Sequence, residues 1–206
     1  MEVTLLQQFV AGLRETSAAE AVSVVAGVAY GVLAVRQNRL CWVFGGLSSA
    51  ILAGLAARAQ LPMQALLQLA YVVMSIYGYW HWSRQPQGEG AMQIGRWPLP
   101  VHLAIGVGLA LATGVLAPWI AVSTEAAWPR LDTATLLASL LATWMVARVR
   151  LENWLYWIVI DAVCVFLYGA QGLMFVAVLY LLYLAIAVFG WFAWRARLSR
   201  QTAPAA

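Results

Sequence analysis

The sequence predicts an all-α integral membrane protein with seven transmembrane helices, and two observations carry this prediction. Of the 206 residues, 64% are apolar and only 10% are charged, whereas an average soluble domain is about half apolar and about a quarter charged. The apolar residues also form continuous runs of roughly the 20 residues that a helix needs to cross a bilayer, not the alternating runs of about ten residues that are typical of a membrane barrel.

Seven apolar segments predict the spans, in chain order, together with a short segment at each end. The spans cover about residues 18–35, 40–57, 62–82, 99–120, 131–147, 153–170 and 172–194. Residues 1–17 begin with an acid and lack the basic start of a secretory signal, so we interpret them as an amphipathic or frayed lead-in. Residues 196–206 are expected to form a tail.

The arginines predict the orientation of the chain in the membrane. All twelve basic residues are arginines, and nine of them fall in the loops after odd-numbered spans or at the C-terminus. Arg14, Arg58 and Arg130 fall on the other side. Because cytoplasmic loops are enriched in arginine and lysine, the sequence predicts a cytoplasmic C-terminus and an N-terminus outside. This asymmetry also explains the net charge of +4, which therefore gives no indication of nucleic-acid binding.

An internal repeat relates the two ends of the chain. Sliding the sequence by 112 residues, without a gap, aligns residues that are uncommon in apolar helices. The matched pairs include Arg36 with Arg148, Trp42 with Trp154, Tyr71 with Tyr183, Gly78 with Gly190, and Trp82 with Trp194.

The repeat predicts two three-helix units, residues 18–83 and 131–195, joined by a linker, residues 84–130, that contains the fourth span. Because four crossings restore the starting side, both units share one orientation. Transporters built from such parallel repeats place their substrate near mid-membrane, between the repeats.

Polar and aromatic side chains gather on one face of the sixth span. On a helix that turns by 100° per residue, Trp154, Trp157, Asp161 and Tyr168 lie within about 60° of one another. An ionised carboxylate at mid-membrane costs about 3 kcal/mol, so Asp161 is predicted either to bind substrate or to clamp a neighbouring helix. Trp154 is equally suited to the aromatic belt at a membrane interface.

A second polar face runs along the third span, at spacings of four, three and four residues. It consists of Gln64, Gln68, Tyr71 and Ser75. The glutamines could instead hydrogen-bond neighbouring helices. In the second unit, Tyr180 and Tyr183 match Gln68 and Tyr71.

The two units differ where a site would lie, because Ser49 in the first matches Asp161 in the second. Such an asymmetric pocket suits a flat, polar, cationic ring, which aromatic faces attract by ~0.5–2 kcal/mol. The candidate substrate-binding residues are Ser49, Gln64, Gln68, Tyr71, Trp154, Trp157, Asp161, Tyr168, Tyr180 and Tyr183. The cysteines and histidines lack ligand spacing, and we predict no catalytic, metal or cofactor site.

The stretch "LDTATLLASLLATWMVARVRLENWLYWIVIDAVCVFLYGAQG" resembles the PnuC family of bacterial vitamin transporters. Trp154, Trp157 and Asp161 meet its W-x-x-W-x-x-x-N/D motif, and the likeness runs from about residue 20 to 195. The resemblance implies a 3+1+3 fold similar to the SWEET sugar transporters but full-length, a homotrimer in the bacterial inner membrane, and no cofactor.

The resemblance also implies facilitated diffusion of nicotinamide riboside, which a cytoplasmic kinase then traps by phosphorylation. Family branches that carry thiamine or riboflavin leave the substrate open, and we rank nicotinamide riboside first, thiamine second and riboflavin third. A non-transporting structural subunit of the membrane is the alternative from another class, and it would not need the two polar faces.

Overall fold

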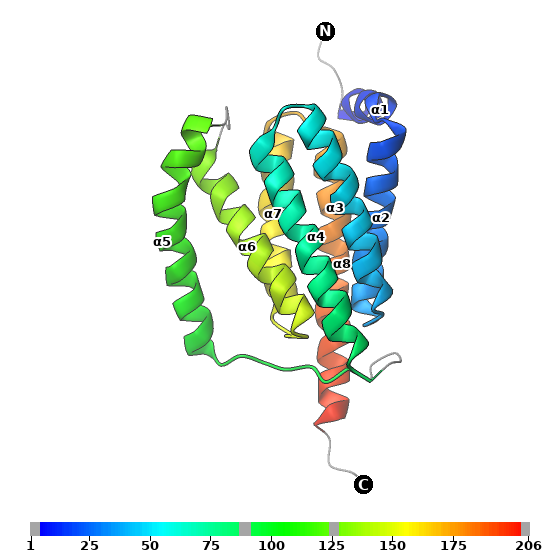
Figure 1. Ribbon diagram of the computed structural model, residues 1–206, viewed down its shortest axis with the longest axis vertical. Coiled ribbons are helices and arrows are strands. Elements are labelled where there is room, and N and C mark those ends of the chain that lie inside the picture. Colours follow the sequence, from blue (N-terminus) through cyan, green and yellow to red (C-terminus); the bar gives the residue numbers. More distant parts are fainter. Residues whose placement is uncertain (1–4, 87–91, 124–127, 203–206) are drawn as a thin grey trace.

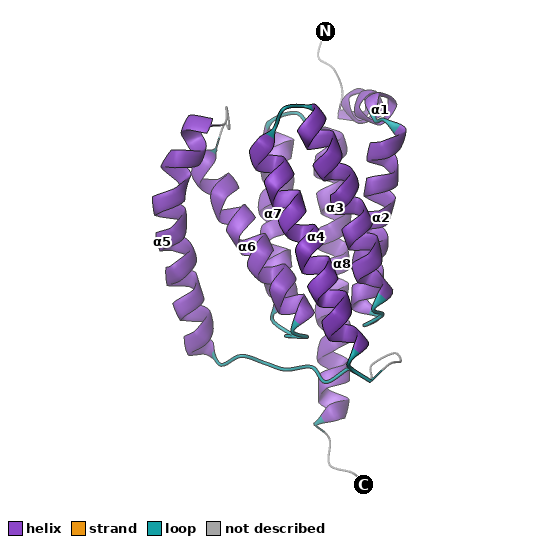
Figure 2. Cartoon of the chain, viewed as in Figure 1, coloured by secondary structure: helices purple, strands orange, loops and turns teal. Residues whose placement is uncertain are grey.

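The computed structural model describes residues 5–86, 92–123 and 128–202. Within these ranges the chain forms eight α-helices and a single isolated β-bridge, and no named strand (Figure 2). The helices are α1 Leu5–Glu15, α2 Ala18–Val35, α3 Leu40–Arg58, α4 Pro62–Ser83, α5 Leu99–Ser123, α6 Pro129–Ala147, α7 Asn153–Ala170 and α8 Met174–Gln201. The structure therefore confirms the all-helical prediction.

Local signals in the sequence explain where the helices begin and end. Ser17 and Glu20 form a capping box at the start of α2, with the Ser17 backbone N–H donating to the Glu20 carboxylate at 2.7 Å. The chain then turns between helices through left-handed backbone conformations. These occur at Gln37, Gln60, Val149 and Gly172, and a shift of 112 residues relates the first to the third and the second to the fourth.

Six of the helices form a ring of neighbours, seen from the side in Figure 1. Helices α2, α3 and α4, here the first half, pack in sequence, as do α6, α7 and α8, here the second half. The halves meet twice, where α4 packs on α6 and where α2 packs on α8. Helix α5 lies outside the ring against α6, and α1 lies across one end of the bundle and contacts α8 (Figure 1).

Four tryptophans lie buried at the other end, here the tryptophan end. In the first half the Trp42 and Trp82 rings meet edge to face at 5.5 Å. In the second half the Trp154 and Trp194 rings do the same at 5.5 Å. These rings explain why a glycine recurs at the matched positions 78 and 190. Each glycine leaves room for a tryptophan ring, since a Cβ at Gly190 would lie 2.6 Å from Trp154.

Two hydrogen bonds at the tryptophan end join the halves reciprocally. Trp82 Nε1 of the first half donates to the Ala147 carbonyl of the second half at 3.1 Å. Trp194 Nε1 of the second half donates to the Val35 carbonyl of the first half, also at 3.1 Å. The same 112-residue shift relates both donors and both acceptors, so the halves are arranged about an approximate two-fold axis.

Five helices are long and apolar enough to cross a membrane by length and composition among the described residues. They are α2, α3, α5, α7 and α8. Helices α4 and α6 have the length but contain more polar residues, such as the glutamines of α4 and the threonines of α6. The structure thus supports five of the seven predicted spans on this criterion. The other two, α4 and α6, do not meet it because they are more polar.

The helix ends differ from the predicted boundaries at a few places. Helix α6 begins at Pro129, before the predicted start at residue 131, and α8 continues to Gln201, into the predicted tail. The predicted lead-in contains the helix α1. Residues 1–4 of that lead-in, 87–91 and 124–127 of the predicted linker, and 203–206 of the predicted tail lie outside the described residues.

Candidate functional site

Asp161 lies near the middle of α7, and its side chain is buried. Only 3% of its surface is exposed, and no hydrogen bond or ion pair joins its carboxylate to another described residue. Its electrostatic neighbours are Cys164 on the same helix and two tyrosines of α8, Tyr180 and Tyr183. A buried carboxylate without a partner is costly. This arrangement leaves the carboxylate free to accept a hydrogen bond from a ligand or to balance a positive charge.

Three predicted tyrosines form a continuous aromatic array beside Asp161. The rings of Tyr168 on α7 and Tyr180 on α8 stack at 5.2 Å with an angle of 13° between their planes. Tyr180 then meets Tyr183 edge to face at 6.0 Å. The array runs from the inner part of the second half toward the end of the bundle that lies opposite the tryptophan end.

The first half contributes neutral polar side chains at similar depth. Gln68 on α4 and Ser49 on α3 are buried, and no hydrogen bond joins either side chain to another described residue. Tyr71 on α4 is partly buried and lies within hydrogen-bonding reach of Ser139 on α6, across the boundary between the halves. Gln64, in contrast, is exposed near the start of α4, so the structure separates it from the other predicted residues.

The two tryptophans of the α7 motif occupy different surroundings. Trp154 is buried at the tryptophan end, against Gly190 and Trp194, and it is therefore not exposed at a membrane interface. Trp157 is partly buried and packs against both apolar clusters of the protein. One cluster holds the four tryptophans and the other surrounds Ala142, Ile160 and Cys164. Trp157 thus lies between the tryptophan end and the tyrosine array.

Two neighbours of this site were missed by the sequence analysis because they are small. Ser139 on α6 faces Tyr71, and Gly27 on α2 faces Tyr183, since a Cβ at Gly27 would lie 2.6 Å from the Tyr183 hydroxyl. A shift of 112 residues relates Gly27 to Ser139 as it relates Tyr71 to Tyr183. The repeat was the signal that could have identified both.

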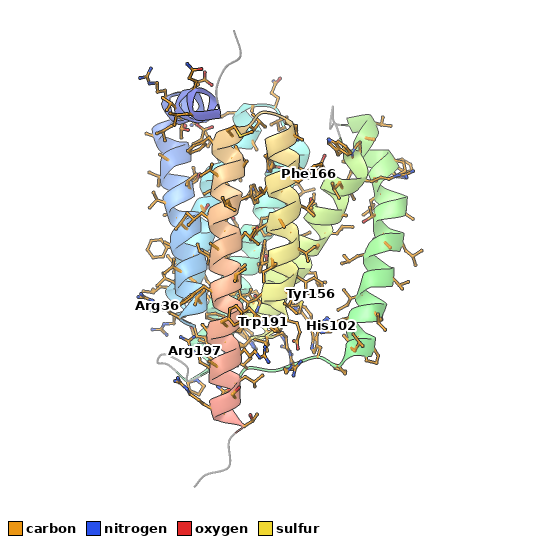
Figure 3. All side chains as sticks on the ribbon, turned by 180° about the vertical axis from the view of Figure 1, so that it is seen from behind. Arg36, His102, Tyr156, Phe166, Trp191 and Arg197 are labelled. Atoms are coloured by element: carbon orange, nitrogen blue, oxygen red, sulfur yellow. The ribbon has the colours of Figure 1, made fainter. Side chains whose placement is uncertain are left out.

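Two other polar side chains at the start of α7 make their contacts elsewhere. Asn153 Nδ2 donates to the Arg150 carbonyl at 2.5 Å, within the turn that precedes α7. Tyr156 points toward α5, where its hydroxyl lies 3.0 Å from His102 Nδ1 (Figure 3). These contacts fix the ends of α7 and α5 and leave Trp157 and Asp161 as the motif residues on the inner face.

Known proteins resemble this chain over most of its length. Residues 17–196 match the protein family described as "Nicotinamide mononucleotide transporter". The Nicotinamide riboside transporter PnuC of Escherichia coli is 28% identical over 206 residues, which cover 87% of this chain and 86% of that protein. The Riboflavin/roseoflavin transporter RibM of Streptomyces davaonensis is 25% identical over 178 residues, which cover 84% and 82%.

A solved structure has a similar fold. The structure described as "Crystal structure of the Vitamin B3 transporter PnuC" aligns with a TM-score of 0.75 and 23% sequence identity, over 96% of this chain and 89% of that chain. The relatives and this structural neighbour are transporters and not enzymes.

Proposed function

Because this chain belongs to the nicotinamide mononucleotide transporter family, whose members are multi-pass membrane transporters, we propose that it carries nicotinamide riboside by facilitated diffusion. The single observation that supports this substrate class most is Asp161, whose buried carboxylate has no hydrogen-bond or ion-pair partner among the described residues and lies beside the tyrosine array. A flat cationic vitamin provides the positive charge and the ring that these groups attract.

Each inner side chain has a proposed role. Trp157 and Tyr71 flank the ring of the vitamin, and Gln68 donates to or accepts from its ribose or amide groups. Asp161 binds a hydroxyl or balances the charge of the ring. Tyr180 and Tyr183, with Ser49, complete the inner surface, whereas Trp154 holds α7 against α8.

The charge at this depth favours the riboside over its phosphorylated form. The twelve basic residues lie at or beyond the ends of the predicted spans, so no arginine accompanies Asp161 at mid-helix. A phosphate group is usually bound by arginine or lysine, and it would meet a carboxylate here. We therefore propose a nucleoside cargo that becomes trapped when a cytoplasmic kinase phosphorylates it.

The proposed architecture has seven crossings in a 3+1+3 arrangement, similar to a full-length SWEET transporter. The ring of α2–α4 and α6–α8 supports it, because α4 and α6 meet at the boundary between the halves, where polar residues need not face lipid. We place the N-terminus outside and the C-terminus in the cytoplasm, so the tryptophan end is cytoplasmic. The halves would rock about the central site and expose it to either side in turn.

The assembly and the location of the protein follow from the family resemblance. We propose a homotrimer in the bacterial cytoplasmic membrane, with lipid against the exposed apolar residues of α5. These residues recur about every four positions along the helix and include Leu103, Val107, Leu111 and Val115.

Riboflavin is the alternative cargo that a comparison supports, because RibM is described as a transporter of riboflavin and roseoflavin. Thiamine remains ahead of it on chemical grounds, because thiamine is cationic and riboflavin is neutral. A neutral ring would gain less from Asp161, whereas the tyrosine array would serve either ring.

Calorimetric titration of the purified protein with nicotinamide riboside, nicotinamide mononucleotide, thiamine and riboflavin tests these proposals. We expect saturable binding of nicotinamide riboside, loss of binding in Trp157→Ala, and normal binding in Trp80→Ala, whose side chain is exposed on α4. Tight binding of the mononucleotide would contradict the charge argument.

A non-transporting membrane subunit makes the opposite prediction. If Trp157→Ala combined with Asp161→Asn leaves vitamin uptake by cells intact at equal expression, the inner residues serve only packing. Loss of uptake with unchanged folding would instead exclude the structural subunit.

A further inference from the structure

The chain segment Met92–Trp97, here the strap, crosses the tryptophan end on its way from α4 to α5 (Figure 1). The strap forms the β-bridge of the structure with the turn between α6 and α7. Gly95 N donates to the Val149 carbonyl at 3.0 Å, and Leu151 N donates to the Gly95 carbonyl at 3.0 Å. The strap is therefore bonded to the second half in register.

Gln201, the last residue of α8, holds the strap from the other side. Its Nε2 donates to the Met92 carbonyl at 2.8 Å, and its Oε1 accepts from Ile94 N at 3.1 Å. One amide side chain thus supplies two hydrogen bonds of the kind a neighbouring β-strand would make. The extension of α8 beyond residue 195 gives this side chain its position.

Glu152 fixes the far end of the strap. It is buried at the start of α7 and accepts from Arg96 Nε at 3.2 Å and from Trp97 N at 3.3 Å. The Arg96 side chain remains largely exposed, so its ion pair is screened by solvent, whereas the bond from the Trp97 backbone fixes the path of the chain.

The strap also buries two apolar side chains between the halves. Met92 has no exposed surface and Ile94 only 6%. Both belong to the apolar cluster that contains Trp42 and Trp82 of the first half and Trp154 and Trp194 of the second. Any separation of the halves at this end must break the reciprocal tryptophan hydrogen bonds and uncover this cluster, including the side chains of the strap.

We propose that the strap is a latch that closes the tryptophan end, and that cargo passes there only when the strap leaves Gln201 and Glu152. This inference rests on the proposed alternating-access transport. The latch acts on one side only, because all the contacts that hold the strap lie at the tryptophan end.

Cys41 offers a built-in reporter of latch opening. Its side chain is fully buried in the same cluster as Met92 and Ile94, whereas the second cysteine, Cys164, belongs to the other cluster. In a Cys164→Ser background, the rate at which N-ethylmaleimide modifies Cys41, followed by mass spectrometry, measures how often the tryptophan end opens. Hydrogen exchange of the peptide that contains the strap gives an independent measurement.

We expect Gln201→Ala to raise the Cys41 modification rate about tenfold, because two hydrogen bonds to the strap are lost. Gln201→Glu should act in the same direction, since a carboxylate cannot donate to the Met92 carbonyl. Ser199→Ala is the matched control on the same helix, because among the described residues the Ser199 hydroxyl donates only to the Arg195 carbonyl of its own turn. The control should leave both the modification rate and the hydrogen exchange of the strap unchanged.

The outcomes separate the latch from the proposed function. Unchanged modification and exchange in both Gln201 variants would overturn the latch, even if the protein transports nicotinamide riboside normally. Faster modification and exchange in both variants would support the latch. If the unaltered protein then bound neither nicotinamide riboside, thiamine nor riboflavin, the transport proposal would fail and the strap would stand as a closure of this end only.

Discussion

Asp161 combines a stability cost with a binding role, and a single substitution separates the two. Asp161→Asn keeps the shape and removes the charge. We expect it to weaken binding of nicotinamide riboside by about tenfold to a hundredfold, the ~1.5–3 kcal/mol typical of a hydrogen bond to a charged group. The same substitution should raise the melting temperature of the ligand-free protein, because a buried carboxylate without a partner is removed. Calorimetry and thermal unfolding in detergent measure the two effects.

Glu20→Gln is the control for this substitution, because Glu20 lies exposed in the capping box at the start of α2, where its charge favours the helix start. It should leave vitamin affinity unchanged and lower the melting temperature slightly. Equal affinity of the unaltered protein and Asp161→Asn for nicotinamide riboside would contradict the role of the carboxylate.

Single residues could be found in the sequence when their chemistry was rare in an apolar segment. Asp161, Trp157 and Gln68 were predicted on this basis, and all three lie at buried or partly buried positions in the ring of helices. Ser139 and Gly27 could not be found this way, because small residues are common in membrane helices and gain meaning only from the side chain that approaches them.

The packing of α8 on α7 depends on the absence of a side chain at residue 190. Gly190→Ala would place a Cβ 2.6 Å from the Trp154 ring, which is itself confined by Trp194. We expect a loss of about 1–3 kcal/mol in the free energy of unfolding, as for other overpacked cores. Thermal or denaturant unfolding of the purified protein measures this loss.

Gly54 on α3 is the matched control, because apart from its chain neighbours and its own helix backbone no atom of the described residues lies within 4 Å of a Cβ at this position. Gly54→Ala should be neutral or stabilise by up to about 1 kcal/mol through the higher helix propensity of alanine. Similar destabilisation by both substitutions would show that helix propensity, and not the Trp154 ring, determines the result.

The helices could be predicted closely because continuous apolar runs define them, and all seven predicted spans begin within two residues of the observed helices. The strap could not be predicted, because its six residues have no apolar period and are held by partners far along the chain, such as Gln201. The packing of α4 on α6 shows the same limit, since the sequence predicts both helices but does not show that they meet across the boundary between the halves.

The two halves are joined by bonds that look equivalent but should not contribute equally. The Val35 carbonyl accepts from both Trp194 Nε1 and Arg197 Nη1, whereas among the described side chains only Trp82 Nε1 donates to the Ala147 carbonyl. Both Trp→Phe variants lose ring volume. Trp82→Phe should in addition lower the free energy of unfolding by about 1–3 kcal/mol, because it leaves the Ala147 carbonyl without a hydrogen bond. Trp194→Phe should cost less, because Arg197 still donates.

Thermal unfolding of both single variants and of the double variant measures this difference. Equal costs would mean that Arg197 does not compensate at Val35. A double-variant cost below the sum of the singles would show that the two bonds act as one clamp between the halves.

At the scale of the whole molecule, transport that depends only on cargo binding must follow the electrochemical potential of the cargo. Nicotinamide riboside carries a positive charge, so its distribution should follow the membrane potential at ~2.3 kcal/mol per 100 mV. In vesicles that contain the purified protein we expect equal concentrations on both sides at zero potential. At about 60 mV, inside negative, the same relation predicts about tenfold accumulation.

Riboflavin, being neutral, should show no such dependence on the membrane potential if it is carried. Accumulation driven by a proton or sodium gradient at zero potential would contradict facilitated diffusion and would instead make Asp161 the first residue to examine for ion coupling.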